Sequence, residues 1–372
     1  MMPALNTLRF RSNPCIELKK LDDLAAEDRE RFRELESDPE FYGIFVAKPP
    51  LVMNLKSVSH QAAELFQSLS IPGHLEVDDD VVDLVLDGIL EIESGERFVS
   101  GADALAIVQP PLDARDIGRL SMDALLHAQD LETNDPQALS MALYLYNRIP
   151  MTPFWKTTFA NVLDHVGADR GSLRALLERE WIAGDPARGT GWLNWSSPTR
   201  SPRGPDDVTY KLYVSPRPER IRDAFEVVAR VLAAFPGTSF KIGDGVTGLL
   251  RPDKLVAYFR TREQLDEVAN ELQRELAGCD AHGVPFTAPI GESGLLSWGV
   301  DPPESERALK WTGPRSWRLW VAQRLGAALA IALSASATGT SIEPWLFAVE
   351  RVRRHGVDVE TWTPSATLWS TS

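Results

Sequence analysis

The chain has 372 residues, of which 44% are hydrophobic and 25% charged, as is usual for a globular protein with a sizeable core. Its net charge of −14 argues against a broad nucleic-acid-binding surface. The two cysteines, Cys15 and Cys279, provide neither a disulfide framework nor the spacing of a zinc site. No signal-peptide pattern is present, and the longest apolar run, 325–333, is too short to cross a bilayer. These features predict a cytoplasmic protein that binds neither nucleic acid nor membranes.

The first half of the chain is expected to be mainly helical. Apolar residues recur at helical spacing in three stretches, which are 16–35, 58–69 and 138–166. The range 80–108 is an exception, because a helical stretch there is followed by two short strand-like runs separated by Ser94-Gly95. We expect a helix followed by a β-hairpin at this place.

A boundary between two regions is expected at 196–205, where Ser, Pro, Gly and Arg predominate. Trp192 and Trp195 precede it and are expected to pack at the edge of a domain. The boundary separates a mainly helical region, 1–195, from a second domain, 206–372.

The second domain is expected to mix strands with helices. Strands are predicted at 210–214, 239–242, 255–259 and 295–300, and helices at 216–234, 261–276 and 314–333. Ser215 stands where an N-cap belongs, before Pro216, and Thr261 forms a capping-box pattern with Gln264. The expected fold class is therefore α+β.

Four cations lie inside or at the ends of apolar, strand-like runs between 209 and 259. They are Lys211, Lys241, Arg251 and Lys254. A cation in such a position is costly unless an anion meets it. In a chain this acidic, the cluster predicts a site for a multiply charged anion, with phosphate as the first candidate.

The strand pattern also predicts where some of these side chains point. Lys211 and Tyr213 share one face of their strand because side chains alternate. The alternative for this pair is a solvated lysine beside a tyrosine at the rim of the sheet. Lys241 is flanked by Phe240 and Ile242, and the glycines after it either permit close approach of a ligand or form a simple turn.

Arg251, Lys254 and His282 can also be explained by a structural role instead of a role in binding or catalysis. Arg251 and Lys254 can hold a loop in place, since Asp253 is near enough in sequence to pair with Arg251. His282 can be a turn histidine whose ring is satisfied by backbone groups.

Four motifs of the second domain resemble the HopA-type effector-related proteins. They are Lys-Leu-Tyr-Val-Ser from 211, Phe-Lys-Ile-Gly from 240, Leu-Leu-Arg-Pro-Asp-Lys from 249 and Ala-His-Gly-Val-Pro-Phe from 281. The resemblance covers roughly 208–372. Some bacterial members accompany kinase-like proteins in class V lanthipeptide and thioamide-peptide biosynthesis. They are thought to act there as lyases that eliminate phosphate from phosphoserine or phosphothreonine.

A more distant similarity is to the phosphothreonine lyases of enteric pathogens and the lyase domains of class III and IV lanthipeptide synthetases. Those proteins have a Lys-x-His strand, a later Phe-Lys, an arginine and a Ser-Tyr-Arg segment. The matching positions here are Lys211, Tyr213, Lys241 and Arg251, then Arg318 in Ser316-Trp317-Arg318, with Tyr258 as a phosphate-binding tyrosine and Arg324 as a less close match.

This resemblance implies β-elimination with Lys241 as the base, which requires a lowered lysine pKa. It implies phosphate binding by Lys211, Arg251, Lys254, Tyr258, Arg318 and Arg324. The general acid is left open, because Tyr213 stands where the distant lyases have histidine, and a phenol of pKa about 10 is expected to be partly ionised among cations. Tyr213 or His282 donates the proton, or the phosphate leaves stabilised by cations alone. No metal or other cofactor is implied.

Two functions follow as hypotheses. The first is a phosphoserine or phosphothreonine lyase that forms dehydroalanine or dehydrobutyrine in a precursor peptide and works with a kinase-like phosphotransferase. The second is a protein that binds a phosphopeptide or a kinase without chemistry. In either case, region 1–195 is expected to recognise the partner or the leader peptide.

Overall fold

The computed structural model describes residues 8–49, 51–108, 116–185, 191–202, 204, 206–302, 316–336, 342–365 and 368. Its helices and antiparallel strands confirm the predicted α+β class. The chain divides into two compact units, each assembled from three segments. The first unit comprises Met1–Arg115, Leu125–Leu143 and Ala322–His355, and the second comprises Asp116–Ala124, Tyr144–Val321 and Gly356–Ser372. The boundary expected at 196–205 falls inside the second unit, and residues 203 and 205 lie outside the described residues.

The first unit contains two antiparallel sheets, ordered β5-β1-β6-β7 and β2-β3-β4. Its strands are β1 (Arg9–Ser12), β2 (Ile16–Lys19), β3 (Phe41–Ala47), β4 (Lys56–Ser59), β5 (Gly73–His74), β6 (Leu90–Ser94) and β7 (Arg97–Val99). Its helices are α1 (Ala26–Phe32), α2 (His60–Ser68), α3 (Asp79–Leu86), α4 (Ala102–Val108) and α15 (Pro344–Arg354), with 3-10 turns at Leu21–Asp23 and Arg33–Ser37. Helices α5 (Arg119–Gln129), α6 (Pro136–Leu145) and α14 (Trp317–Ser336) have residues in both units.

The predicted helix and β-hairpin of 80–108 are confirmed by α3, β6 and β7. The three helical stretches are confirmed only in part. Strands β2 and β4 occupy the starts of 16–35 and 58–69, because Ile16-Glu17-Leu18-Lys19 alternates with the period of a strand. The stretch 138–166 is broken into α6, α7 (Pro153–Thr158) and α8 (Val162–His165), since Pro150 and Pro153 interrupt a continuous helix.

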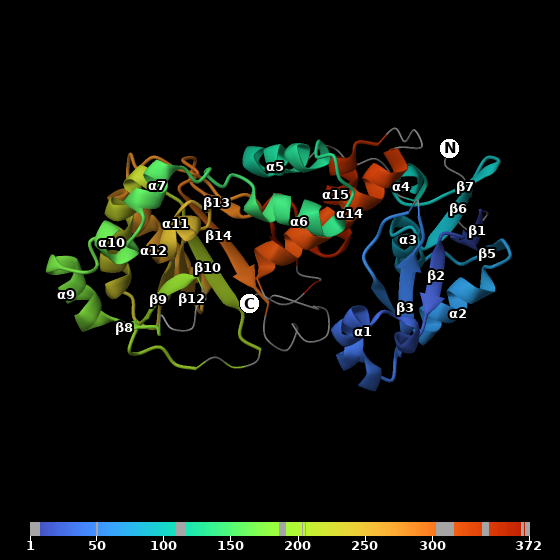
Figure 1. The fold of residues 1–372 in the computed structure, drawn as a ribbon, viewed down its shortest axis with the longest axis horizontal. Helices are drawn as coiled ribbons and strands as arrows, with labels where there is room; N and C mark the ends of the chain where they lie inside the picture. The colour runs from blue at the N-terminus through green and yellow to red at the C-terminus, as the bar shows by residue number, and fades with distance from the viewer. Residues whose placement is uncertain are drawn as a thin grey trace. The chain divides into compact units, whose positions relative to one another are not determined.

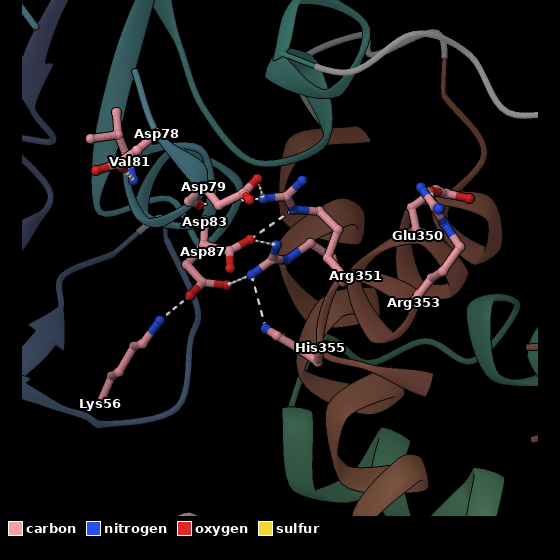
Figure 2. A network of polar contacts seen from close by, with 11 residues as sticks. Lys56, Asp78, Asp79, Val81, Asp83, Asp87, Glu350, Arg351, Arg353 and His355 are labelled. Carbon is pink, nitrogen blue, oxygen red and sulfur yellow. Dashed lines mark hydrogen bonds and ion pairs between the residues drawn. The ribbon is translucent and has the colours of Figure 1, made fainter. Parts of the chain in front are cut away.

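A network of charges joins α3 to α15 within the first unit (Figure 2). Arg351 is almost fully buried and donates to Asp83 at 2.7 Å and to Asp87 at 2.6 Å. Arg354 donates to Asp83 at 2.9 Å, and Lys56 pairs with Asp87. The cations hold the pKa of Asp87 well below its usual range, although burial opposes them. Buried charges persist when they are paired in this way, so the network fixes the late helix α15 against an early part of the chain.

The second unit is built around a seven-stranded antiparallel sheet of order β13-β14-β10-β12-β11-β9-β8 (Figure 1). Its strands are β8 (Ile182–Ala183), β9 (Trp192–Ser196), β10 (Thr209–Val214), β11 (Ser239–Gly243), β12 (Leu255–Phe259), β13 (Ala288–Ile290) and β14 (Leu296–Asp301). Besides α7 and α8, its other described elements are α9 (Gly171–Glu180), a 3-10 turn (Pro218–Arg220), α10 (Ile221–Ala233), α11 (Gly245–Leu249), α12 (Arg262–Glu275), β15 (Val357–Asp358) and β16 (Thr363–Pro364). All four predicted strands are confirmed here.

Of the two helix N-caps predicted in this unit, Thr261 is confirmed and Ser215 is wrong. Thr261 caps α12 as expected, because its side chain accepts from the amide of Gln264. Ser215 does not cap α10, which begins at Ile221. The Ser215 hydroxyl instead donates to the carbonyl of Pro252 at 2.6 Å and links two loops.

The two faces of the seven-stranded sheet have different chemistry. On one face, Leu212, Phe240 and Ala257 form a core with α10 and α12. Figure 1 shows these two helices beside the sheet. The residues next to them in sequence point to the other face, because side chains alternate along a strand. That other face carries Lys211 and Lys241, and we refer to it as the cationic face.

Candidate functional site

Strand register collects the central residues of the cationic face. Lys211 of β10 lies opposite Tyr258 of β12 on one side and Gly299 of β14 on the other. Tyr213 of β10 and Lys241 of β11 both lie opposite Val256, from the two sides of β12. Paired residues share a face, so two lysines and two tyrosines are brought together by strands that are far apart in sequence.

Lys211 is held by a carboxylate on the neighbouring strand. Its Nζ lies 2.5 Å from Oδ2 of Asp301, and both side chains are 9% exposed. Oδ1 of Asp301 accepts from the backbone amide of Trp317 at 2.9 Å, which fixes the carboxylate in place. The sequence gives no sign of this pair, since the two residues are joined only by the register of β10 and β14.

Lys241 lies beside aromatic rings, and the carboxylates of Asp253 and Asp301 only partly oppose the lowering of its pKa. Its Nζ is 4.0 Å from the ring centroid of Trp192 and 5.6 Å from that of Tyr258. Burial lowers the pKa of Lys241 to about 8, with a further contribution from the positive charge of Lys211. Within the part of the chain that the structure describes, no carboxylate forms an ion pair with this lysine.

Arg251 and Arg318 share the carboxylate of Asp253. Arg251 makes a bidentate contact, with Nε and Nη2 at 2.8 and 2.9 Å from the two oxygens, and Nη2 also donates to the Tyr144 hydroxyl at 2.8 Å. Arg318 is 1% exposed and donates to Asp253, to the carbonyl of Pro285 and to the carbonyl of Tyr144. The two guanidinium groups hold the pKa of Asp253 well below its usual range against the effect of burial. The pairing of Arg251 with Asp253 is the structural alternative that the sequence left open.

Lys254 is buried and forms a pair with the partly buried His282. Nζ of Lys254 donates to the Pro216 carbonyl at 2.9 Å and lies 2.7 Å from Nδ1 of His282, while Nε2 of His282 contacts the carbonyl of Asn147. Burial lowers the pKa of Lys254 to about 7 and, together with the charge of Lys254, that of His282 to about 3. The contacts fit a neutral histidine with its proton on Nε2, so both ring nitrogens are engaged.

Both tyrosines of the cationic face keep their protons. Burial raises the pKa of Tyr213 and of Tyr258 well above 10, and the carboxylate of Asp301 adds to the effect in each case. Partial ionisation of Tyr213 among cations was expected, and the opposite holds because burial outweighs the nearby positive charges. Tyr213 is 4% exposed and packs against Val256 and Val284.

The structure places the predicted site residues in three groups. Lys211, Tyr213, Lys241 and Tyr258 lie on the cationic face, and Arg251 joins them through Trp192, whose ring centroid is 5.4 Å from its guanidinium. A second group is occupied by contacts with other protein residues. It comprises Lys254 and His282, which contact each other, and Arg318, which is bonded to Asp253 and to two backbone carbonyls. Arg324 belongs to the first unit, where burial lowers its pKa to about 10 and the carboxylate of Asp87 opposes the shift.

Three functional candidates escaped sequence reasoning. Trp192 is interpreted from the sequence as ordinary packing, Asp301 lies one residue beyond the strand predicted at 295–300, and Tyr144 lies far upstream. Of these three residues, only Trp192 could have been recognised as a site candidate from the sequence, because it is an aromatic residue beside a cluster of glycines and cations. Within the described residues, no group of three or more His, Cys, Asp or Glu side chains is arranged to hold a metal ion. Nor does any described helix have the length and apolar character needed to cross a membrane.

Two effector proteins are among the solved structures that resemble this chain. The first is an effector protein from Pseudomonas syringae pv. tomato strain DC3000, at 9% identity and a TM-score of 0.39, covering 68% of this chain and 99% of that protein. The second is an effector protein from Pseudomonas syringae pv. syringae strain 61, at 13% identity and a TM-score of 0.36, covering 66% and 99%. No protein-family model and no curated protein sequence matches the chain.

Proposed function

We propose that this protein is a phosphoserine or phosphothreonine lyase acting on a phosphorylated precursor peptide in lanthipeptide-type biosynthesis, beside a kinase-like phosphotransferase. The observation that carries the proposal is Lys241, a lysine of lowered pKa that has no carboxylate partner among the described residues and shares a sheet face with Lys211 and two protonated tyrosines. Two of the four motifs that resemble the HopA-type proteins, those starting at 211 and 240, lie on β10 and β11 of this face.

The arrangement supports a division of roles for the elimination. Nζ of neutral Lys241 takes the α-proton, and the electron pair of the Cα–H bond becomes the Cα=Cβ double bond. The Cβ–O bond breaks, and its electron pair leaves with the phosphate. With a pKa of about 8, about one quarter of Lys241 is neutral at pH 7.5, which suits a general base.

Tyr213 is the better of the two candidates for the general acid. Its raised pKa keeps the phenol protonated and able to donate to the leaving phosphate oxygen. His282 would first have to break its contacts with Lys254 and Asn147, and its lowered pKa keeps it neutral at pH 7. We therefore assign His282 and Lys254 to positioning of the loops around the site.

The phosphate is assigned to Lys211, Arg251 and Tyr258. The Arg251 side chain is 20% exposed, so it can offer a further N–H group while Asp253 keeps its orientation. Arg318 is 1% exposed and bonded to three protein acceptors. Its proposed role is to hold Asp253, and through it Arg251, and not to contact the phosphate.

Mass spectrometry of a phosphothreonine peptide incubated with the protein tests the proposal. We expect loss of phosphoric acid with wild-type protein and a rate roughly 10²- to 10⁴-fold lower with Lys241→Met, the usual contribution of a general base. Lys156→Met serves as the matched control, because Lys156 is exposed on α7, and it should leave the rate unchanged.

The same experiment distinguishes the lyase from the alternative function, a protein that binds a phosphopeptide or a kinase without catalysing a reaction. Saturable binding of the phosphopeptide without any dehydrated product, with and without a kinase partner, would overturn the lyase and support the binder. Unimpaired elimination by Lys241→Met would overturn the assigned base alone.

A further inference from the structure

The segment that follows β9 carries an arginine whose backbone is fixed in place. The Arg200 amide donates to the Ser197 carbonyl at 3.0 Å, which closes a turn. The side-chain oxygens of Ser197 and Thr199 both accept from the Gly237 amide, at 3.3 and 3.1 Å. The stretch 196–205, predicted from the sequence as a boundary between domains, is therefore attached at its start to the turn before β11.

The same segment is also attached to the end of β12. Arg260, which directly follows β12, donates to the carbonyls of Ser201 and Pro202 at 2.9 and 2.5 Å. Arg200 thus lies between two anchored points, close to Tyr258 of the cationic face. Burial is the main influence on the pKa of both side chains, and each of them also affects the pKa of the other.

Arg200 has no counter-ion among the residues that the structure describes. The residue is exposed, yet the surrounding protein removes enough water to lower its pKa, which the Tyr258 phenol opposes and Arg260 reinforces. No carboxylate of the described residues takes part in this balance or forms an ion pair with Arg200. A guanidinium group that has lost part of its water without gaining an anion is well suited to bind one.

The cations of the proposed lyase site, by contrast, already have counter-charges. Lys211 is paired with Asp301, and Asp253 is shared by Arg251 and Arg318. Three cations and two carboxylates leave one net positive charge, while a phosphorylated side chain carries nearly two negative charges at pH 7.5. One charge of the phosphate therefore remains unbalanced when the lysine base is neutral, and unbalanced charge on a partly buried surface is costly.

We propose that Arg200 is a further phosphate-binding residue and supplies the missing positive charge. The phosphate then lies over Tyr258, with Lys211 on the β10 side and Arg200 on the side of the β9 segment. The guanidinium can offer two parallel N–H groups to the phosphoryl oxygens. Arg260 acts as a positioning residue, because it holds the backbone that carries Arg200. This role rests on the proposed function in that its ligand is a phosphorylated peptide, but it does not require that elimination takes place.

The test measures binding to full-length protein in a Lys241→Met background, from which the proposed base has been removed. The probe is N-acetyl-phosphothreonine N-methylamide, whose phosphate is its only charged group, titrated at pH 7.5 and followed by ³¹P NMR. Arg200→Met and Arg200→Lys are each added to this background. Arg230→Met is the matched control, since it removes the same charge from an exposed position of α10, the helix that packs on the opposite face of the sheet.

We expect Arg200→Met to raise the Kd of the probe roughly tenfold, the loss expected for a charge-assisted hydrogen bond. Arg200→Lys should raise it about threefold, because lysine keeps the charge but lacks the planar fork. The control should change it less than about twofold, as an exposed ion pair contributes little. A Kd for Arg200→Met within a factor of two of the control, or no saturable binding of the probe to the background protein, would overturn the proposal.

Two further measurements identify what Arg200 binds and separate this proposal from the lyase. A second probe carries a glutamate directly before the phosphothreonine, and a loss of affinity confined to that probe would overturn the proposal by assigning Arg200 to a flanking acidic residue. Elimination by Arg200→Met at the wild-type kcat/KM would overturn the role of Arg200 and leave the lyase intact. Weakened binding of the first probe, in a protein whose wild type forms no dehydrated product, would support Arg200 and overturn the lyase.

Discussion

Lys241 illustrates how single residues set the chemistry of this protein. The side chain is surrounded by the rings of Trp192 and Tyr258 and by the charge of Lys211. Rings remove water from the ammonium group without neutralising it, and the nearby lysine repels it. Both effects favour the neutral amine, which is the form that a base needs.

The expected pH dependence of the proposed elimination follows from this environment. We expect kcat/KM to rise about tenfold per pH unit below a pKa of about 8 and to level off above it, as Lys241 loses its proton. Lys241→Arg should lack this rise, because arginine stays protonated. Folding stability should also increase between about pH 8 and 10.5, since the folded state then binds fewer protons than the unfolded state. A rate independent of pH from 6 to 9 would contradict the assignment.

The buried pair of Lys211 and Asp301 gives a second prediction. Asp301→Asn removes the charge opposite Lys211 but keeps an oxygen for the Trp317 amide, and should lower the free energy of unfolding by roughly 3–5 kcal/mol. Inorganic phosphate should then raise the melting temperature of the variant more than that of the wild type, because it can replace the lost anion. Equal shifts at matched ionic strength would show that phosphate does not reach Lys211.

At the scale of elements, the segment between β11 and β12 determines where Arg251 and Asp253 lie relative to Lys241. Gly243 and Gly248 approach so closely that a Cβ on Gly243 would lie 2.5 Å from the Gly248 backbone. Glycine is therefore needed at 243 and 248 because the backbone at the end of β11 contacts the backbone of α11 there. The contact turns the chain from β11 into α11 and leads it back to Arg251 and Asp253.

Arg251 and Arg318 make the carboxylate of Asp253 important for stability. Asp253→Asn leaves Arg251 and the buried Arg318 without their counter-charge, and should lower the free energy of unfolding in urea by roughly 3–5 kcal/mol. Asp266→Asn is the matched control, since Asp266 pairs with Arg262 at 2.8 Å on the exposed side of α12. The control should change stability by less than about 1 kcal/mol. Similar values for both variants would show that the Asp253 network contributes little.

At the scale of the whole molecule, the two units are assembled from interleaved segments. The first unit takes its last helix, α15, from late in the chain, and the charges of Figure 2 attach that helix to α3. The second unit takes β8 and β9 from before the predicted boundary at 196–205. A cut at that boundary therefore removes parts of the sheet that carries the site.

The fragment 206–372 is a direct test of this organisation. It lacks Trp195, which stacks on Phe240 at 5.2 Å, and Trp192, which covers Lys241. We expect no cooperative urea transition and no elimination by the fragment. Full-length protein cut after folding at a protease site introduced between Ser201 and Pro202 should keep both. A fragment 206–372 that unfolds cooperatively with full activity would contradict the interleaved units.

The sequence by itself determined the strands of the cationic face and the residues that point to it. Side-chain alternation is a local property of the backbone, so 210–214 and 239–242 were sufficient to place Lys211 and Tyr213 together and to separate Lys241 from Phe240. The helix and hairpin of 80–108 and the cap at Thr261 were local in the same sense.

Only the tertiary structure decided the partners of those residues. Asp301 reaches Lys211, and Trp192 reaches Lys241, through strand register across segments that local patterns cannot align. The short strands β2 and β4 were likewise mistaken for helix because four residues give too little periodicity to tell the two apart. The protonation of Lys241, Tyr213 and His282 depends on burial and neighbouring charge, which exist only once the sheet is assembled.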